Sequence, residues 1–148
     1  MPAENLVILL DLSRSMDATD VKPSRLARAR QEIEDIAKAT ASNKNGSINI
    51  GLIAFAGAVH VITPLTDDMD TMRSLLPSLN TDIVYTQGAR LVPALTRAAE
   101  MLSSAPGNEK HILVLSDGDF DDGAISILST EQSLVKQGIH IHAMGIGT

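Results

Sequence analysis

The residues best suited to chemistry in this chain lie directly after its first apolar segment. That segment is Leu6–Leu10, and Asp11-Leu12-Ser13-Arg14-Ser15 follows it. A carboxylate with hydroxyls two and four positions later, where a buried strand emerges, brings three oxygen-bearing side chains toward one small volume. Such oxygen donors suit a hard divalent cation such as Mg²⁺. A single carboxylate would hold the ion weakly, so further acids must come from elsewhere in the chain.

A second suitable acid follows another apolar segment much later in the chain. This segment, His111–Leu115, precedes Ser116-Asp117-Gly118. It is too short to span a membrane, and its branched residues are typical of a buried strand. In an open parallel α/β sheet, ligands bind beyond the carboxyl ends of the strands, where the strand order reverses. We therefore expect Asp11 and Asp117 to face the same crevice.

Strand and helix patterns alternate along the rest of the sequence, which predicts a mostly parallel sheet with helices on both faces. Strands are expected at residues 5–10, 48–55, 58–63, 111–117 and 139–146, and helices at residues 23–41, 68–76, 91–103 and 124–137. The short Ala56-Gly57 connection makes the third strand an antiparallel partner of the second, at the edge of the sheet. Right-handed crossovers then favour the order 3-2-1-4-5. The order reverses between strands 1 and 4, where both acids lie.

Several polar residues have simpler structural interpretations. Thr66 or Asp67 is expected to cap the helix over residues 68–76. The acids at positions 119–122 are interpreted as loop acids or as caps for the helix over residues 124–137. Three arginines of the first helix are expected on its solvated face, namely Arg25, Arg28 and Arg30.

Composition limits the class of protein. At 148 residues, the chain has the length of one domain, and we expect a single domain over residues 1–148. Hydrophobic residues make up 44% and aromatic residues 2%, so the core must be aliphatic. The formal net charge of -6 argues against a nucleic-acid partner, which requires a basic surface. No apolar stretch approaches the ~18 residues of a spanning helix, so we expect no direct membrane insertion of this segment.

Taken together, these segments resemble the von Willebrand factor type A (VWA) domain, a three-layer, Rossmann-like fold. In that family an Asp-x-Ser-x-Ser motif, a distant Thr and a distant Asp form a metal-ion-dependent adhesion site. The resemblance implies that Mg²⁺ or Mn²⁺ is held by four residues of this chain: Asp11, Ser13, Ser15 and Asp117. It also implies that an acidic side chain of a protein partner completes the coordination of the ion.

Further sequence segments resemble one group within this family, the bacterial membrane-anchored members linked to aerotolerance (Bat type) and to MoxR-type ATPases. These segments are Pro23–Leu26, Gly51–Gly57 and Thr63–Asp68. The resemblance implies a parent protein in the bacterial inner membrane, with this domain on the periplasmic side. It also implies a MoxR-type ATPase or sister VWA proteins as partners. Because family members continue beyond the strand pattern of residues 139–146, we expect the last strand and helix of the usual fold to be missing.

One element departs from the family pattern. Where the family has Gln-Gly-Thr, this chain has Gln87-Gly88-Ala89, and Ala89 offers no oxygen. Thr86 would reach the site only in a shifted loop. Alternatively, the guanidinium of Arg14 or Arg90 would take the place of the cation and hold the carboxylates.

Three functions are therefore open. The first is a non-catalytic protein-interaction module with a metal-ion-dependent adhesion site. The second is a degenerate VWA scaffold that binds partners without metal, which Ala89 favours. The third is a Mg²⁺-dependent phosphoryl-transfer enzyme with Asp11 as acceptor. Such enzymes generally require a second acid where this chain has Ser13, so we expect no enzyme.

Overall fold

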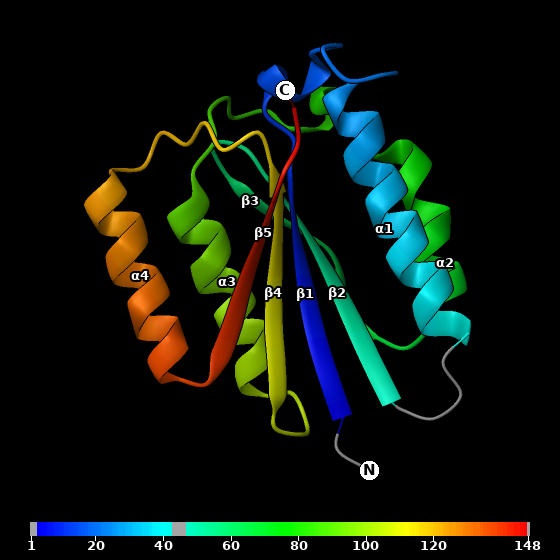
Figure 1. Ribbon diagram of the computed structural model, residues 1–148, viewed down its shortest axis with the longest axis vertical. Coiled ribbons are helices and arrows are strands. Elements are labelled where there is room, and N and C mark those ends of the chain that lie inside the picture. Colours follow the sequence, from blue (N-terminus) through cyan, green and yellow to red (C-terminus); the bar gives the residue numbers. More distant parts are fainter. Residues whose placement is uncertain (1–2, 43–46, 148) are drawn as a thin grey trace.

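A five-stranded sheet forms the centre of the computed structural model, which describes residues 3–42 and 47–147, and helices cover both of its faces (Figure 1). The strands are β1 (Ala3–Asp11), β2 (Ser47–Phe55), β3 (Val59–Thr66), β4 (Glu109–Ser116) and β5 (Ile139–Gly145). The helices are α1 (Arg25–Ser42), α2 (Met69–Leu75), α3 (Leu91–Ser103) and α4 (Ala124–Lys136). Three short 3-10 turns are η1 (Arg14–Asp17), η2 (Leu76–Ser78) and η3 (Thr81–Ile83).

The strand order is β3-β2-β1-β4-β5, as predicted. β1 runs parallel to β2 and β4, β4 runs parallel to β5, and β3 pairs antiparallel with β2 at the edge. Leu10 of β1 is in register with Leu115 of β4, so the two strands end at nearly the same level. The carboxyl ends of β1 and β4 therefore meet where the strand order reverses.

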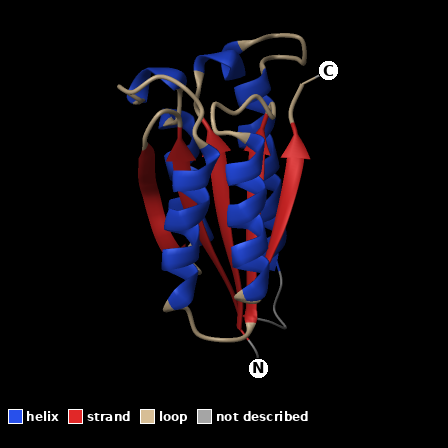
Figure 2. Ribbon diagram, turned by 90° about the vertical axis from the view of Figure 1, so that its left-hand side faces the viewer, coloured by secondary structure: helices blue, strands red, loops and turns tan. Residues whose placement is uncertain are grey.

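The central strand β1 is buried on both faces, which explains its unbroken apolar sequence. Ile8 and Leu10 belong to the core beneath α1 and α2, whereas Val7 and Leu9 belong to the core beneath α3 and α4. All four side chains are inaccessible to solvent. Figures 1 and 2 show the resulting three layers, with α1 and α2 on one face of the sheet and α3 and α4 on the other.

α3 and α4 begin at the predicted residues, whereas α1 begins two residues and α2 one residue later than predicted. α1 begins at Arg25 because the hydroxyl of Ser24 accepts a hydrogen bond from the amide of Ala27 (3.0 Å). The prediction of Thr66 or Asp67 as the cap of α2 is wrong by one or two residues, since the side chain of Asp68 accepts the amide of Thr71 (3.1 Å). The polar composition of residues 42–46 also predicts a turn, but most of this segment lies outside the described residues.

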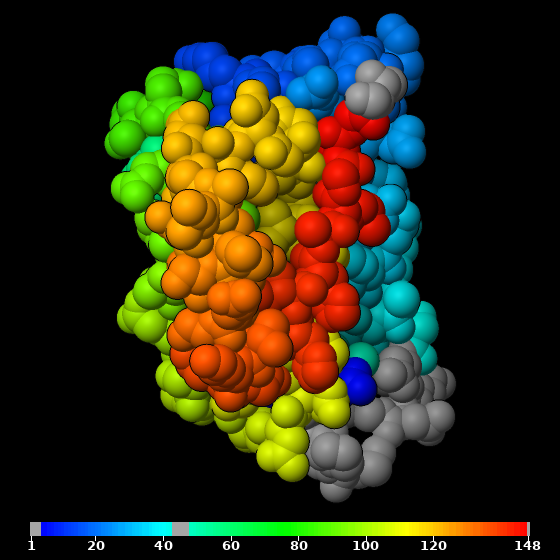
Figure 3. Space-filling view, turned by 60° about the vertical axis from the view of Figure 1, so that its left-hand side comes forward, coloured from blue at the N-terminus to red at the C-terminus, as the bar shows by residue number. Residues whose placement is uncertain are grey.

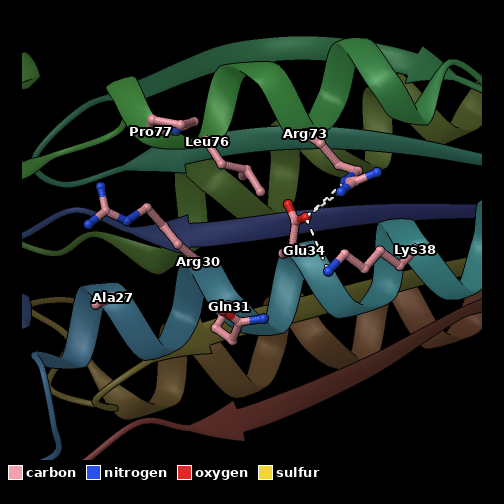
Figure 4. Close-up of a pocket in the computed structure, with 8 residues that line it drawn as sticks. All are labelled: Ala27, Arg30, Gln31, Glu34, Lys38, Arg73, Leu76 and Pro77. Atoms are coloured by element: carbon pink, nitrogen blue, oxygen red, sulfur yellow. Dashed lines mark hydrogen bonds and ion pairs between the residues drawn. The ribbon is translucent and has the colours of Figure 1, made fainter.

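A shallow pocket of about 390 Å³ runs along the seam between α1 and α2 (Figure 4). Its centre is Glu34, which accepts from Arg73 Nε (2.9 Å) and lies 3.7 Å from Lys38 Nζ. The Arg73 guanidinium lowers the pKa of Glu34. Because these charged side chains pair with one another, we interpret them as an ion-pair network that joins α1 and α2. We do not interpret the pocket as a ligand site.

Candidate metal centre

The candidate site lies beyond the carboxyl ends of β1 and β4. Asp11 is the last residue of β1, and the loop that follows is fixed by a hydrogen bond from the amide of Leu12 to the carbonyl of Phe55 (2.8 Å). Ser116 ends β4, and its carbonyl accepts the amide of Ile146 (2.9 Å). Figure 3 shows how the end of β5 (red) meets the segment that carries η1 and the start of α1 (blue).

Asp11 is fully buried, with 0% of its surface exposed. Its Oδ1 accepts from the amide of Ser13 (2.8 Å), and its Oδ2 accepts from the hydroxyl of Ser116 (2.7 Å). Burial raises the pKa of Asp11, with a smaller contribution from the negative charge of Asp117, and the hydrogen bonds from both serines oppose this shift. An ionised Asp11 therefore costs free energy that a nearby cation would offset.

The two serines of the motif present their hydroxyls as a pair. Ser13 Oγ and Ser15 Oγ lie 3.1 Å apart, because η1 turns the chain back on itself, with the amide of Met16 bonded to the carbonyl of Ser13 (3.0 Å). The buried side chain of Met16 anchors this turn in the core. Neighbouring ligands of an octahedral Mg²⁺, each about 2.1 Å from the ion, are about 3.0 Å apart. The hydroxyl pair thus fits the spacing that such an ion requires.

Asp117 follows β4, and only 5% of its side-chain surface is exposed. Its Oδ1 accepts from the amide of Asp119 (3.0 Å). Gly118 allows the sharp turn between them by adopting a φ of 84°, a conformation that favours glycine. Asp11 ends β1 and Asp117 follows the adjacent parallel strand β4, so both residues lie at the same edge of the sheet.

The guanidinium at this site belongs to Arg25, so the prediction that Arg25 lies on the solvated face of α1 is wrong. Its Nη1 donates to Asp117 Oδ2 (2.9 Å) and to the carbonyl of Ser15 (3.4 Å). Its Nε and Nη2 donate to the two carboxylate oxygens of Asp20 (2.8 and 3.0 Å). The hydrogen bond with Asp20 raises the pKa of Arg25, so the group remains charged.

The other cationic and hydroxyl candidates lie in different surroundings. Arg14 forms a long ion pair with Asp82 (3.7 Å), and both side chains are mostly exposed. Arg90 is exposed at the N-cap of α3. Thr86 lies against the turn between β2 and β3, where its carbonyl accepts the amide of Gly57 (2.9 Å). The structure thus places Arg25, and not Arg14 or Arg90, against Asp117.

Ala89 is buried, and the loop after β4 holds it in place. Its amide donates to Asp121 Oδ2 (2.8 Å), and its carbonyl accepts the amide of Asp121 (2.8 Å). Asp122 accepts the amides of Leu91 (2.5 Å) and Val92 (3.1 Å). These acids therefore cap the start of α3, whereas the sequence interpretation offered them as loop acids or as caps for α4.

Within residues 3–42 and 47–147, no three side chains of His, Asp and Glu converge as a metal cage. The candidate centre therefore depends on the hydroxyls of Ser13 and Ser15 beside its carboxylates.

These features define an α/β domain of the Rossmann-like class with polar residues at a topological switch point. The sequence of residues 6–119 matches the family described as the von Willebrand factor type A domain. Since this match spans most of the chain, the protein belongs to the von Willebrand factor type A family.

Two similar solved structures come from the bacterial aerotolerance group that the sequence predicts. A UPF0353 protein of Mycolicibacterium paratuberculosis is 30% identical over 97% of this chain, which spans 44% of the length of that protein. An aerotolerance-related membrane protein of Bacteroides fragilis is 29% identical, with a TM-score of 0.87, over 97% of this chain and 68% of that one. BatB of Bacteroides thetaiotaomicron is 27% identical, with a TM-score of 0.86, over 96% of this chain and 66% of that one. The SpRpn10 VWA domain, at 19% identity and a TM-score of 0.81, supports the fold alone.

Proposed function

We propose that this domain binds an acidic side chain of a protein partner at the β1–β4 edge, with the help of a divalent cation. VWA domains are a protein-interaction fold that is often metal-dependent, and the present chain has that fold. The observation that supports the finer proposal is the pair of hydroxyls of Ser13 and Ser15, 3.1 Å apart beside the buried carboxylate of Asp11.

Four residues would hold Mg²⁺ or Mn²⁺: Ser13 and Ser15 through their hydroxyls directly, and Asp11 and Asp117 largely through bridging water. A bound cation would supply an open coordination position for an incoming carboxylate. The hydrogen bonds from Ser13 and Ser116 fix the orientation of the Asp11 carboxylate before any ligand arrives. The two serine hydroxyls are neutral, so they keep the negative charge of the site low, which favours an anionic ligand from the partner.

The environment of Asp11 also supports binding over catalysis. A phosphoryl acceptor must present a carboxylate oxygen to the incoming phosphorus. Asp11 is fully buried, and each of its carboxylate oxygens already accepts a hydrogen bond. We therefore propose a non-catalytic domain.

A second candidate is binding without metal. Ala89 supplies no side-chain oxygen, and Arg25 already neutralises Asp117. In that case the partner would be bound without a cation, and Arg25 would fix the shape of this edge by holding Asp117 and Asp20 together. The calorimetric experiment below separates the two candidates.

The cellular setting is proposed from relatives. The Bacteroides fragilis relative is described as a membrane protein, and no helix within the described ranges is long and apolar enough to cross a membrane. We propose a parent protein in the bacterial inner membrane with this domain on the periplasmic side. Candidate partners are a MoxR-type ATPase and sister VWA proteins.

The test is a calorimetric titration of the domain with Mn²⁺ and Mg²⁺. The double variant Ser13→Ala/Ser15→Ala removes both hydroxyls. A matched control, Ser129→Ala/Ser133→Ala, removes two exposed hydroxyls from α4. Saturable binding that the first variant loses and the control retains would support the metal-dependent proposal.

A second titration then adds a Glu-containing peptide, with the Gln-containing peptide as its control. Preference for the Glu peptide only in the presence of Mn²⁺ is the expected result. An absence of metal binding to the native domain would refute the metal-dependent proposal and leave the metal-independent candidate. Equal binding of both peptides would refute recognition of a carboxylate.

A further inference from the structure

We infer that Arg25 is a tethered competitor of the divalent cation: it occupies Asp117 and thereby lowers the metal affinity of the site. The inference rests on the proposed function, because it concerns the same four residues, but it assigns a role to a residue outside them. Arg25 is a positioning residue here, since it acts on the metal through Asp117.

The first observation is how completely the guanidinium is engaged. Its three nitrogens donate to two carboxylates, Asp20 and Asp117, and Nη1 also reaches the carbonyl of Ser15. Only 23% of the Arg25 side chain is exposed, and the Asp117 side chain is nearly buried. A bidentate pair of this kind fixes the plane and direction of an arginine far more than a single contact does.

The second observation is the place of the guanidinium relative to the hydroxyl pair. Ser15 contributes its carbonyl to Arg25 and its hydroxyl to the pair with Ser13. The positive charge of Arg25 therefore contacts the backbone of Ser15, whose hydroxyl is proposed to ligate the cation. Two cations drawn to the same edge repel each other, and both require the negative charge of Asp117.

The surrounding chain keeps Arg25 in this position. It is the first residue of α1, and its amide donates to the carbonyl of Ala18 (2.9 Å). Gly147, beyond β5, passes so close that a Cβ on it would lie 3.2 Å from Arg25 Nε and 3.5 Å from a carboxylate oxygen of Asp20. The side chain of Arg25 is thus confined by the segment after β5. Figure 3 shows that this segment and the start of α1 meet at the surface.

Asp20 makes the competition reversible. When Asp117 turns toward a bound cation, Arg25 loses the bond from Nη1 but keeps both bonds to Asp20. Without the cation, Arg25 neutralises Asp117 and closes this edge of the sheet. Metal binding therefore includes the cost of displacing Arg25 from Asp117.

The test compares Mn²⁺ affinities of the native domain, Arg25→Gln and a charge-matched control, Arg97→Gln, which removes an exposed arginine from α3. We expect Arg25→Gln to bind Mn²⁺ about tenfold more tightly or better, because a unit charge a few ångströms from a divalent cation weakens its binding by about this factor even in water. Arg97→Gln should match the native domain. A purely structural role for Arg25 predicts the opposite sign, since loosening Asp117 and Asp20 would weaken metal binding.

The outcomes separate this inference from the proposed function. Metal binding by the native domain with equal or weaker binding by Arg25→Gln overturns the inference and leaves the proposed function intact. Binding by Arg25→Gln alone supports the inference and overturns metal dependence of the native domain. Binding by neither overturns both.

A second measurement requires no variant. Side-chain ¹⁵N resonances of Arg25 are followed by NMR while diamagnetic Mg²⁺ is added to the native domain. We expect the Nη signals to change as the bond to Asp117 is lost, while the Nε–H signal, which reports the bond to Asp20, stays in place. Bound Mg²⁺ with unchanged Nη signals would overturn the inference.

Discussion

Replacement of Asp122 by alanine should destabilise the domain, although this residue belongs to a surface loop. Its carboxylate accepts the amides of Leu91 (2.5 Å) and Val92 (3.1 Å), the first two amides of α3. The N-cap residue itself, Arg90, supplies no side-chain hydrogen bond. Asp122→Ala therefore leaves the first turn of α3 without the acceptor that caps it.

The size of the effect follows from the two bonds. Loss of a capping side chain costs about 1 kcal/mol, and a charged acceptor at a helix N-terminus adds to this. We expect the free energy of unfolding to fall by about 2 kcal/mol. In a chain of this length, that corresponds to a Tm about 4–8 °C lower.

Urea denaturation followed by circular dichroism, together with calorimetric Tm values, measures this change. Asp119→Ala is the matched control, because Asp119 is exposed in the same loop and contributes its amide, not its side chain, to the bond with Asp117. Asp122→Asn retains an acceptor oxygen and should recover part of the loss. Equal stability of Asp122→Ala and Asp119→Ala would refute the assignment of Asp122 as the cap of α3.

Three further predictions concern Asp11, Gly57 and Glu34. Burial raises the pKa of Asp11 above 3.8, so the native domain loses stability as the pH rises and Asp11 ionises. The metal-free variant Asp11→Asn should lack this loss in urea denaturation measured at several pH values. The same variant should bind no Mn²⁺. Gly57→Ala should lower the free energy of unfolding by about 1–3 kcal/mol in urea denaturation, since a Cβ there would lie 2.1 Å from the carbonyl oxygen of Gln87. The Arg73 guanidinium lowers the pKa of Glu34. The stability that the Glu34–Arg73 ion pair contributes is therefore present above pH 4.5 and is lost as the pH falls through the lowered pKa. Glu34→Gln should remove that pH dependence and cause a small loss of Tm that diminishes in high salt. An unchanged pH profile in either charge variant, or a native-like Gly57→Ala, would contradict the corresponding assignment.

The sequence predicted those parts of the fold that depend on local patterns. The unbroken apolar run before Asp11 indicated a strand buried on both faces, and β1 is such a strand. The short connection through Ala56 and Gly57 indicated the antiparallel edge strand. The positions of Asp11 and Asp117 at strand ends then followed from the rule for open parallel sheets.

The parts that the sequence did not reveal are contacts between distant segments. Arg25 and Asp117 are 92 positions apart, and the helical pattern of α1 assigns Arg25 only to a solvated face. As the first residue of the helix, however, Arg25 extends past its end toward the sheet edge. Asp122 likewise caps α3, whose first residue, Leu91, lies 31 positions earlier in the chain. Local capping rules consider only the helix that follows a capping residue. The phrase Pro23–Leu26 marked Arg25 as part of the family pattern but gave no indication of its partner.

The contacts of Asp121 and Asp122 affect how this domain can be redesigned. The loop after β4 contains Asp117 of the candidate centre, and the same loop holds the amides of Ala89 and Leu91. The segment before α3 is therefore built against that loop. A transplant of one segment into another VWA domain would leave unmatched donors or acceptors, so the two must be exchanged together. For protein engineering, they form a single module made of two pieces of chain.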